Sequence, residues 1–488
     1  MDVIIRNFNY KFWILYRLSQ NFIYDHIISI IVKIIPRRYR YMKYKQFFVL
    51  IFIVLISIQL FVYDNFTHKT TTPIPSIAIL NKPALDGRNG TNSSSGLKIP
   101  SEAEFRMNWI KNKLERIAKH SERWEIMKFL DDVEPLPEPT TRIHIFYQVG
   151  FRNIEMDNEW SGWNHDFVFN KIKKDSKLNS RESPSHNPPI NIASNFYPLL
   201  GCYSSKDPNI INTHFKEIRD IGIGVVVVSW LPLQQEKSNV DVLALLLDVA
   251  EKYGLKIALH IEVYVGHNVS DVFKTTQLII QKYSNHKNFY KLLKNGKHLP
   301  VFYIFYSYRF PVEEWKERLA SDGELTVRGS SYDAIFIGHL RDANNKLEIH
   351  RSNFDGFYTY YASNAYTYGS TWKNWNTLAQ FAEKHNLLFF PSVAPGYVDT
   401  NARPWNSALT RHRTRGHYYQ VAWRAALASL SYGVSVTSYN NWLDGSQIEP
   451  ALPHNSYLDY QPEGPYFYLN LTRFWVKQFV TQTSDKRN

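Results

Sequence analysis

Residues 223–229 read IGVVVVS, an uncharged and mostly β-branched run that precedes an amphipathic stretch near 240–253. A strand this uniformly apolar is buried on both faces, which is typical of parallel sheets covered by helices. The same pattern of a short apolar run and a longer amphipathic stretch recurs beyond residue 140. We count eight such runs: Ile143–Tyr147, Ile223–Ser229, Ile257–Val263, Val301–Tyr306, Ala334–Gly338, Gly356–Tyr360, Leu387–Val393 and Val434–Asn440.

Eight buried strands that alternate with helices predict an α/β fold, a single closed (β/α)8 barrel of the TIM type over residues 141–488. The helices are expected near 209–220, 240–253, 270–283, 311–320, 373–385, 416–431 and 466–480. An open, doubly wound sheet is the alternative. No glycine-rich phosphate loop follows any of the runs, which disfavours the nucleotide-binding form of that alternative.

The N-terminal region contains a second strong signal, the apolar run FFVLIFIVLISIQLFV at Phe47–Val62. Its length predicts one transmembrane helix over residues 47–63. Several basic residues precede it (Arg37, Arg38, Arg40, Lys43 and Lys45), so the positive-inside rule places a basic tail, residues 1–46, in the cytosol. A cleaved signal peptide and a buried helix are the alternatives. The late start of the run and the lack of a small-residue cleavage site favour the type II membrane anchor.

Residues 64–100 contain TTTPIPS and NGTNSSSG, a composition typical of a flexible luminal stalk. A lead-in helix and a Pro-rich linker are expected at residues 101–140, before the barrel. Five N-glycosylation sequons lie on the predicted luminal side of the membrane, at Asn65, Asn89, Asn92, Asn268 and Asn470. They support the same orientation, since N-glycans are added in the secretory pathway.

Composition excludes several function classes. Aromatic residues make up 15% of the 488 residues and charged residues 21%, which excludes a largely disordered chain. The net charge is +13, but +7 of it lies in the first 45 residues, so we predict no nucleic-acid partner. The lone Cys202 excludes a disulfide framework and a Cys-rich zinc module. No Asp-x-Asp motif or metal-ligand spacing is present, so we expect no glycosyltransferase, metal or cofactor.

In a parallel barrel the active site lies at the carboxyl ends of the strands. The residues at those ends are Tyr147, Ser229, Trp230, His260, Glu262, Tyr264, Tyr306, Tyr308, Tyr360, Pro391, Ser392, Asn440, Asn441, Trp442 and Asp444. Aromatic rings beside a few carboxylates are typical of a carbohydrate site, although the rings could also only cap the core. The long connections 148–208 and 394–415 are expected to shape this site.

Several motifs carry a resemblance to a known family. They are IHIFY (143–147), WNH (163–165), FYPLLGCYSS with Asp207 and Pro208 (196–208), SWLP (229–232), HIEVY (260–264), YTYYASNAYTYGS (358–370), PSVAPGYVDT with Arg403-Pro-Trp-Asn (391–406) and SYNNWLDGSQIEPA (438–451). Over about 100–480 the chain resembles glycoside hydrolase family 99, the endo-α-1,2-mannosidases. The resemblance implies a (β/α)8 barrel, a type II Golgi membrane anchor, and internal cleavage of the α-1,2 bond that joins a glucosylated mannose to an N-glycan.

The resemblance also implies functional residues. In the family pattern, glutamates stand at the positions of Asn441 and Asp444 and form the catalytic pair, a base for the mannose 2-hydroxyl and an acid for the leaving group. Substrate-binding roles are implied for Trp163, Asn164, His165, Trp230, His260, Glu262, Tyr264, Tyr360, Tyr397, Asp399, Arg403 and Trp442. The implied partner is an N-glycan or another mannose-containing oligosaccharide, bound without a cofactor.

Both catalytic positions are altered, and so are three others. Gly150-Phe151-Arg152, Leu231 and Tyr306 replace a Trp-Tyr-Gly segment, a tyrosine and an aspartate of the family pattern, respectively. An amide accepts no proton as a carboxylate does, which should cost about 10²–10⁴ in rate. Three hypotheses follow. The first is a Golgi-type glycoside hydrolase of altered efficiency or specificity, in which Asp444 remains the acid and Glu262 or Asp399 compensates for Asn441. The others are a non-catalytic glycan-binding or regulatory paralogue and a scaffold for another Golgi enzyme. The substitutions favour the second.

Overall fold

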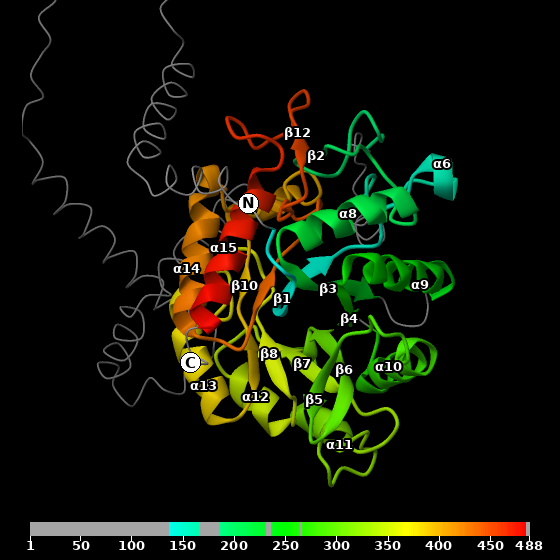
Figure 1. Cartoon of the computed structure of the whole chain (residues 1–488), viewed down its shortest axis with the longest axis vertical. Helices are drawn as coiled ribbons and strands as arrows, with labels where there is room; N and C mark the ends of the chain where they lie inside the picture. Colours follow the sequence, from blue (N-terminus) through cyan, green and yellow to red (C-terminus); the bar gives the residue numbers. More distant parts are fainter. Residues whose placement is uncertain (1–135, 166–185, 231–235, 264–265, 485–488) are drawn as a thin grey trace, which may run out of the picture. The chain divides into compact units, whose positions relative to one another are not determined.

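The computed structural model describes residues 136–165, 186–230, 236–263 and 266–484 (Figure 1). The predicted cytosolic tail, transmembrane helix and stalk and most of the lead-in segment lie outside these residues. Within the described ranges, no helix is both long and apolar enough to cross a membrane. The predicted anchor at residues 47–63 therefore stays a prediction.

Parallel strands form a nearly closed barrel at the centre of the described part. They are β1 (Thr140–Tyr147), β3 (Ile223–Trp230), β4 (Lys256–Glu262), β6 (Lys297–Phe305), β7 (Ile335–His339), β8 (Gly356–Tyr358), β9 (Leu388–Phe390), β10 (Ser392–Val393) and β11 (Val434–Val436). Their order is β10-β11-β1-β3-β4-β6-β7-β8-β9. Two short antiparallel additions lie outside this ring, β5 (Lys291–Lys294) on β6 and β12 (Ala451–Leu452) on β2 (Tyr197–Pro198).

The eight predicted runs supply all of the barrel strands. Strand β9 pairs with β8 and β10 pairs with β11, and only Pro391 separates β9 from β10. A proline has no N–H to donate to the ladder, so it interrupts what the sequence suggests is one strand. The prediction of an α/β barrel of the TIM type is thus confirmed as a parallel, nearly closed ring.

Helices surround the strands in Figure 1. They are α8 (Pro208–Asp220), α9 (Glu236–Tyr253), α10 (Val269–Tyr283), α11 (Val312–Leu319), α12 (Asn345–Arg351), α13 (Trp375–Lys384), α14 (His417–Ser429) and α15 (Phe467–Ser484). Short turns add α6 (Ile154–Asp157), η3 (Ser307–Arg309), η4 (Trp372–Asn374), η5 (Pro404–Leu409) and η6 (Thr414–Gly416). The seven predicted helices are present, whereas α12 was not predicted.

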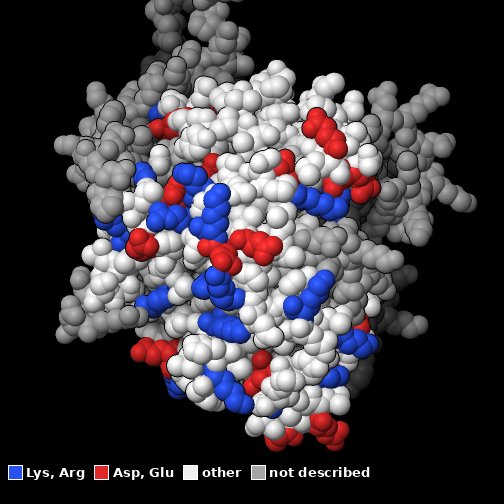
Figure 2. Space-filling view, turned by 45° about the vertical axis from the view of Figure 1, so that its right-hand side comes forward, with Lys and Arg blue, Asp and Glu red and all other residues white. Residues whose placement is uncertain are grey.

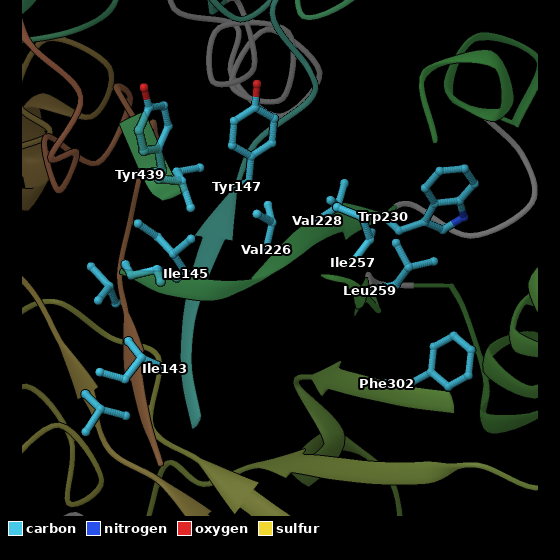
Figure 3. Packing of buried hydrophobic residues seen from close by; sticks show 14 of the residues in the cluster. Ile143, Ile145, Tyr147, Val226, Val228, Trp230, Ile257, Leu259, Phe302 and Tyr439 are labelled. Atoms are coloured by element: carbon cyan, nitrogen blue, oxygen red, sulfur yellow. The ribbon is translucent and has the colours of Figure 1, made fainter. Parts of the chain in front are cut away.

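Side chains of each strand alternate between two apolar clusters. The outer cluster contains Ile143 and Ile145 of β1 with Val226 and Val228 of β3, together with residues of the helices (Figure 3). The inner cluster fills the barrel and includes Phe146. Because both faces are buried, the strands read as continuous apolar runs. The filled interior leaves the loops at the carboxyl ends of the strands as the place for a site.

Candidate active site

The two altered catalytic positions lie on the tight turn that follows β11. Asn441 Nδ2 donates to Asp444 Oδ2 at 2.8 Å, and the Asp444 backbone N–H donates to Asn441 Oδ1 at 3.3 Å. The Asn441 N–H donates to Ser438 Oγ at 2.8 Å. Gly445 adopts a φ of 58°, and a Cβ there would lie 2.3 Å from the carbonyl oxygen of Val398. The turn is therefore closely held, with the amide and the carboxylate in direct contact.

Asp444 has a second partner on the loop after β10. Arg403 Nη1 donates to Asp444 Oδ1 at 2.8 Å and to Asp399 Oδ2 at 3.0 Å. The buried Asp399 also accepts hydrogen bonds from the Tyr397 hydroxyl and from Asn406 Nδ2, both at 2.8 Å. The contact between Arg403 and Asp444 thus links this loop to the turn after β11, and the ion pair with Asp399 holds Arg403 in place. This brings Tyr397, Asp399, Arg403 and Asp444 together.

The pKa of Asp444 is raised above the usual value of an aspartate. Burial raises its pKa, and the nearby Asp399 and Glu262 carboxylates add to that effect, while the Arg403 guanidinium opposes it. The side chain remains 21% exposed, so it is accessible from the mouth of the barrel. A carboxylic acid with a raised pKa is suited to give a proton to a leaving group.

A second group of predicted residues comes from β4 and β8. His260 is fully buried inside the barrel, where its Nε2 lies 2.7 Å from the Tyr358 hydroxyl and its Nδ1 lies 3.7 Å from Glu262 Oε1. Its ring stacks on Tyr360, with 5.0 Å between ring centroids. Burial lowers the pKa of His260, with Glu262 opposing. The buried His260 imidazole therefore contacts both Glu262 and Tyr360 from inside the barrel.

Tyr360 and Tyr306 connect the two groups. Burial raises the pKa of both phenols, and the carboxylates of Asp444 and Glu262 raise both further. A hydrogen bond to Asn441 acts on Tyr360 in the opposite direction. Both tyrosines adopt left-handed φ values, 51° and 59°, a strain that is common at functional sites. Together Asn441, Asp444, Glu262, Tyr306 and Tyr360 define the candidate pocket.

The three predicted tryptophans are buried. Trp163 is fully buried, stacks on Phe151 at 4.2 Å and donates its indole N–H to the Tyr203 carbonyl. Trp442 is also fully buried, and Trp230 is 3% exposed within the outer cluster. Their predicted contacts with substrate remain untested, and in the described structure each packs against protein.

The remaining predicted residues are dispersed. Asn164 and His165 are half-buried, and Asn164 Nδ2 donates to the Trp160 carbonyl at 3.1 Å. Tyr264 lies outside the described residues, as does Leu231. Among the residues that the structure describes, no group of three His, Cys, Asp or Glu side chains could hold a metal ion.

Two of the five glycosylation candidates are described. Asn268 is exposed and caps α10, its Oδ1 accepting from the Asp271 N–H at 3.0 Å. The capping bond uses the side-chain oxygen of Asn268 and not its amide nitrogen, which is the atom that carries a glycan. Asn470 is half-buried within α15. Asn65, Asn89 and Asn92 lie outside the described ranges.

Glu449 is a residue beneath the candidate site that the sequence analysis did not single out. It is fully buried beneath the turn after β11 and accepts hydrogen bonds from the Tyr203 hydroxyl (2.8 Å), Trp442 Nε1 (2.8 Å) and His214 Nε2 (3.2 Å). The sequence does contain a signal for Glu449, because it is a carboxylate within a motif that is otherwise expected to be buried. A buried carboxylate needs hydrogen-bond donors around it. Glu449 ties the catalytic turn to α8.

Glu217 of α8 is the second acidic group beneath this turn. The Tyr439 hydroxyl donates to its Oε2 at 2.6 Å. Burial raises the pKa of Glu217 to about 7, and the Tyr439 hydrogen bond opposes that rise. Its protonated form is therefore favoured in the folded state.

Stability should consequently fall as Glu217 loses its proton. A glutamate in the unfolded chain titrates near 4.3, so the Glu217 contribution is complete below that pH and is lost as the pH rises through about 7. In Glu217→Gln the free energy of unfolding should fall less between pH 5 and pH 8 than in the natural chain, and the difference should be up to about 3 kcal/mol. Urea denaturation across this range measures it. The matched control is Glu317→Gln on the exposed face of α11, and equal slopes in the two variants would refute the assignment.

Charges on the surface do not separate by sign on the face shown in Figure 2. Lys and Arg side chains are interspersed with Asp and Glu side chains over its described part. This face therefore resembles an ordinary mixed protein surface, whereas a nucleic-acid footprint is a continuous basic stripe.

Comparisons with known proteins agree with one another. The profile of Glycosyl hydrolase family 99 matches residues 140–481. A glycoprotein endo-alpha-1,2-mannosidase of Rattus norvegicus is 41% identical over 357 residues, covering 71% of this chain and 77% of the relative. A glycoprotein endo-alpha-1,2-mannosidase-like protein of Homo sapiens is 38% identical over 361 residues, covering 71% and 79%. The solved GH99 endo-alpha-mannosidase of Bacteroides thetaiotaomicron is 36% identical with a TM-score of 0.64, covering 71% of this chain and 99% of its own.

Proposed function

Because the chain belongs to glycosyl hydrolase family 99, we propose that its barrel mouth binds a mannose-containing oligosaccharide, the glucosylated mannose arm of an N-glycan. We further propose that it cleaves the internal α-1,2 bond of this arm at least about 10²-fold more slowly than a site with two glutamates would. The relatives with an endo-mannosidase name support the substrate class. The altered pair supports the low rate.

The contact between Asn441 and Asp444 carries this proposal. The base of the implied mechanism must take a proton from the mannose 2-hydroxyl, and the amide of Asn441 offers only a weakly basic carbonyl oxygen. Its Nδ2 instead donates to Asp444, whose other oxygen accepts from Arg403. Asp444 retains an acid's raised pKa, but its neighbour lacks the complementary base.

One observation favours a second candidate, a working endo-mannosidase with a relocated base. Glu262 acts electrostatically on Asp444, Tyr306 and Tyr360, so its carboxylate lies near the same pocket from β4. Its side chain is 13% exposed, enough for contact with a sugar hydroxyl. In this candidate Glu262 would accept the proton and Asp444 would protonate the leaving group.

We also propose that the protein is a type II Golgi membrane protein with its barrel in the lumen. The apolar run at 47–62, the basic residues before it and the five sequons after it support this location. The exposed position of Asn268 is compatible with glycosylation there.

A paired binding and turnover assay tests the function. The full-length chain is titrated with a glucosylated high-mannose N-glycan, and release of a glucosyl-mannose disaccharide is followed by mass spectrometry. We expect specific binding with little release, and no binding of a chitin oligosaccharide as the control. Absence of binding would refute the proposal. Fast release that Glu262→Gln abolishes would establish the second candidate instead.

A further inference from the structure

Tyrosines and arginines form a second group at the barrel mouth. The Arg309 guanidinium lies 3.8 Å from the ring centroid of Tyr306, and that of Arg341 lies 5.7 Å from the centroid of Tyr308. The Tyr308 and Tyr361 hydroxyls are 3.2 Å apart. We call these five residues, Tyr306, Tyr308, Tyr361, Arg309 and Arg341, the arginine rim.

Three neighbouring strands place the arginine rim beside the pocket. Strands β6, β7 and β8 are paired in this order, side by side in Figure 1. Tyr306 and Arg309 follow the end of β6, Arg341 follows β7 and Tyr361 follows β8. All strands of the ring are parallel, so these ends share one edge. Tyr306 belongs both to the arginine rim and to the candidate pocket, so the two are contiguous.

Within the described part of the chain, protein carboxylates balance the positive charge of the rim only at Arg341, and weakly. Among the described residues, Arg309 has no acidic side chain within ion-pair distance, and Arg341 has only Asp342, at 3.8 Å, with both side chains exposed. The pocket carboxylates Asp444 and Glu262 each have another partner, Arg403 at 2.8 Å and His260 at 3.7 Å.

The stacked geometry keeps the guanidinium donors available. When an arginine lies over an aromatic ring, the flat face of its guanidinium packs against the ring. The guanidinium N–H groups lie in the plane of that group and stay available to donate hydrogen bonds. Such a fork matches the oxygens of a tetrahedral oxyanion, and the resulting charge-assisted hydrogen bonds are stronger than neutral ones. Tyrosine hydroxyls nearby can donate further hydrogen bonds to the same oxygens.

We propose that the arginine rim binds a phosphate or sulfate ester carried by the oligosaccharide in the pocket. This inference rests on the proposed function, because the sugar must first occupy the site beside Tyr306. The rim then makes the protein a reader of charged mannose-containing glycans, with the ester held by Arg309 and Arg341.

Matched ligands test this proposal on the full-length chain. Three mannose oligosaccharides of equal size are titrated by calorimetry: one neutral, one with a 6-phosphate and one with a 6-sulfate. We expect an ester to bind about tenfold more tightly than the neutral sugar, because one or two charge-assisted hydrogen bonds are added. The phosphate and sulfate arms decide which ester is preferred. Added salt should reduce the preference.

Charge-removal variants locate the effect. Arg309→Gln/Arg341→Gln should lose the tenfold preference and keep the affinity for the neutral sugar. The control Arg351→Gln/Lys384→Gln removes the same charge from exposed positions at the C-terminal ends of α12 and α13, and should keep the preference.

Three outcomes are distinguishable. Equal affinity for all three sugars would overturn the rim proposal and leave the proposed function intact. A preference that persists in Arg309→Gln/Arg341→Gln would also overturn it. If none of the three sugars binds, the proposed function fails and the rim proposal fails with it.

Discussion

The Asn441→Glu/Asp444→Glu variant should cleave a glucosylated high-mannose N-glycan about 10²–10⁴-fold faster than the natural chain. The change supplies the missing base and lengthens the acid by one methylene, and a misplacement of about 1 Å can cost 10²-fold. The turn that carries both positions is held by Ser438 and by the close approach of Gly445 to Val398, so the new side chains start from a defined backbone. Disaccharide release at fixed glycan concentration measures the gain.

Electrostatics around the turn should separate the roles of the two glutamates in this variant. Arg403 donates to position 444, whereas position 441 lies beside the Tyr360 hydroxyl. Two carboxylates in one pocket cannot both ionise freely, so the pKa of one rises and it becomes the acid.

An isosteric control separates chemistry from shape. Asn441→Gln/Asp444→Gln gives both side chains the length of glutamate without a carboxylate at either position, so its rate should not exceed that of the natural chain. If Asn441→Glu/Asp444→Glu binds the glycan but stays as slow as the natural chain, the missing carboxylate at position 441 and the shorter one at position 444 are not the cause of low turnover. The altered residues Gly150–Arg152 and Tyr306 would then be examined.

Replacing Glu449 by leucine should lower the free energy of unfolding by about 3–5 kcal/mol. The substitution would leave the Tyr203 hydroxyl and the His214 imidazole without this acceptor in a fully buried place. The Trp442 indole N–H would lose its 2.8 Å bond and keep only the 3.2 Å bond to the Tyr203 hydroxyl. Each unsatisfied buried donor costs about 1–3 kcal/mol. Urea denaturation of the natural and Glu449→Leu chains measures the loss.

Two further variants keep this test interpretable. Glu449→Gln retains one acceptor oxygen and should lose less, about 1–2 kcal/mol. Glu317→Leu, on the exposed face of α11, should change stability by less than about 0.5 kcal/mol. A Glu449→Leu chain as stable as the natural one would show that the buried carboxylate does not hold the turn to α8.

The barrel was predictable because its strands are buried on both faces. The run 223–229 lies within β3, and the other seven runs each overlap a barrel strand. Helix α12 escaped prediction because it spans seven residues, of which only Asn345 and Ile349 are buried, too few to establish a helical period. In the sequence, the only sign of the break between β9 and β10 is Pro391. Whether a proline interrupts a strand depends on how the neighbouring strands pair with it.

The site was only partly predictable. The family resemblance identified Asn441, Asp444, Asp399 and Arg403, and the structure brings these four into contact. Arg341 follows a predicted strand closely and could have been found by the rule that selected Tyr306 and Tyr308. Glu449 could have been found as a carboxylate within a buried motif.

The sequence by itself determined the barrel and the family pattern, and it showed Asn441 and Asp444 at the two positions where the family resemblance implies glutamates, because periodicity and residue identity are local properties. Only the tertiary structure decided that Arg403 joins Asp399 to Asp444, that Glu262 lies near Tyr360, and that Trp163 and Trp442 are buried. These relations connect loops that follow different strands and lie far apart in the chain. Their distances depend on how the closed ring sets each strand end beside the others, which no local pattern contains.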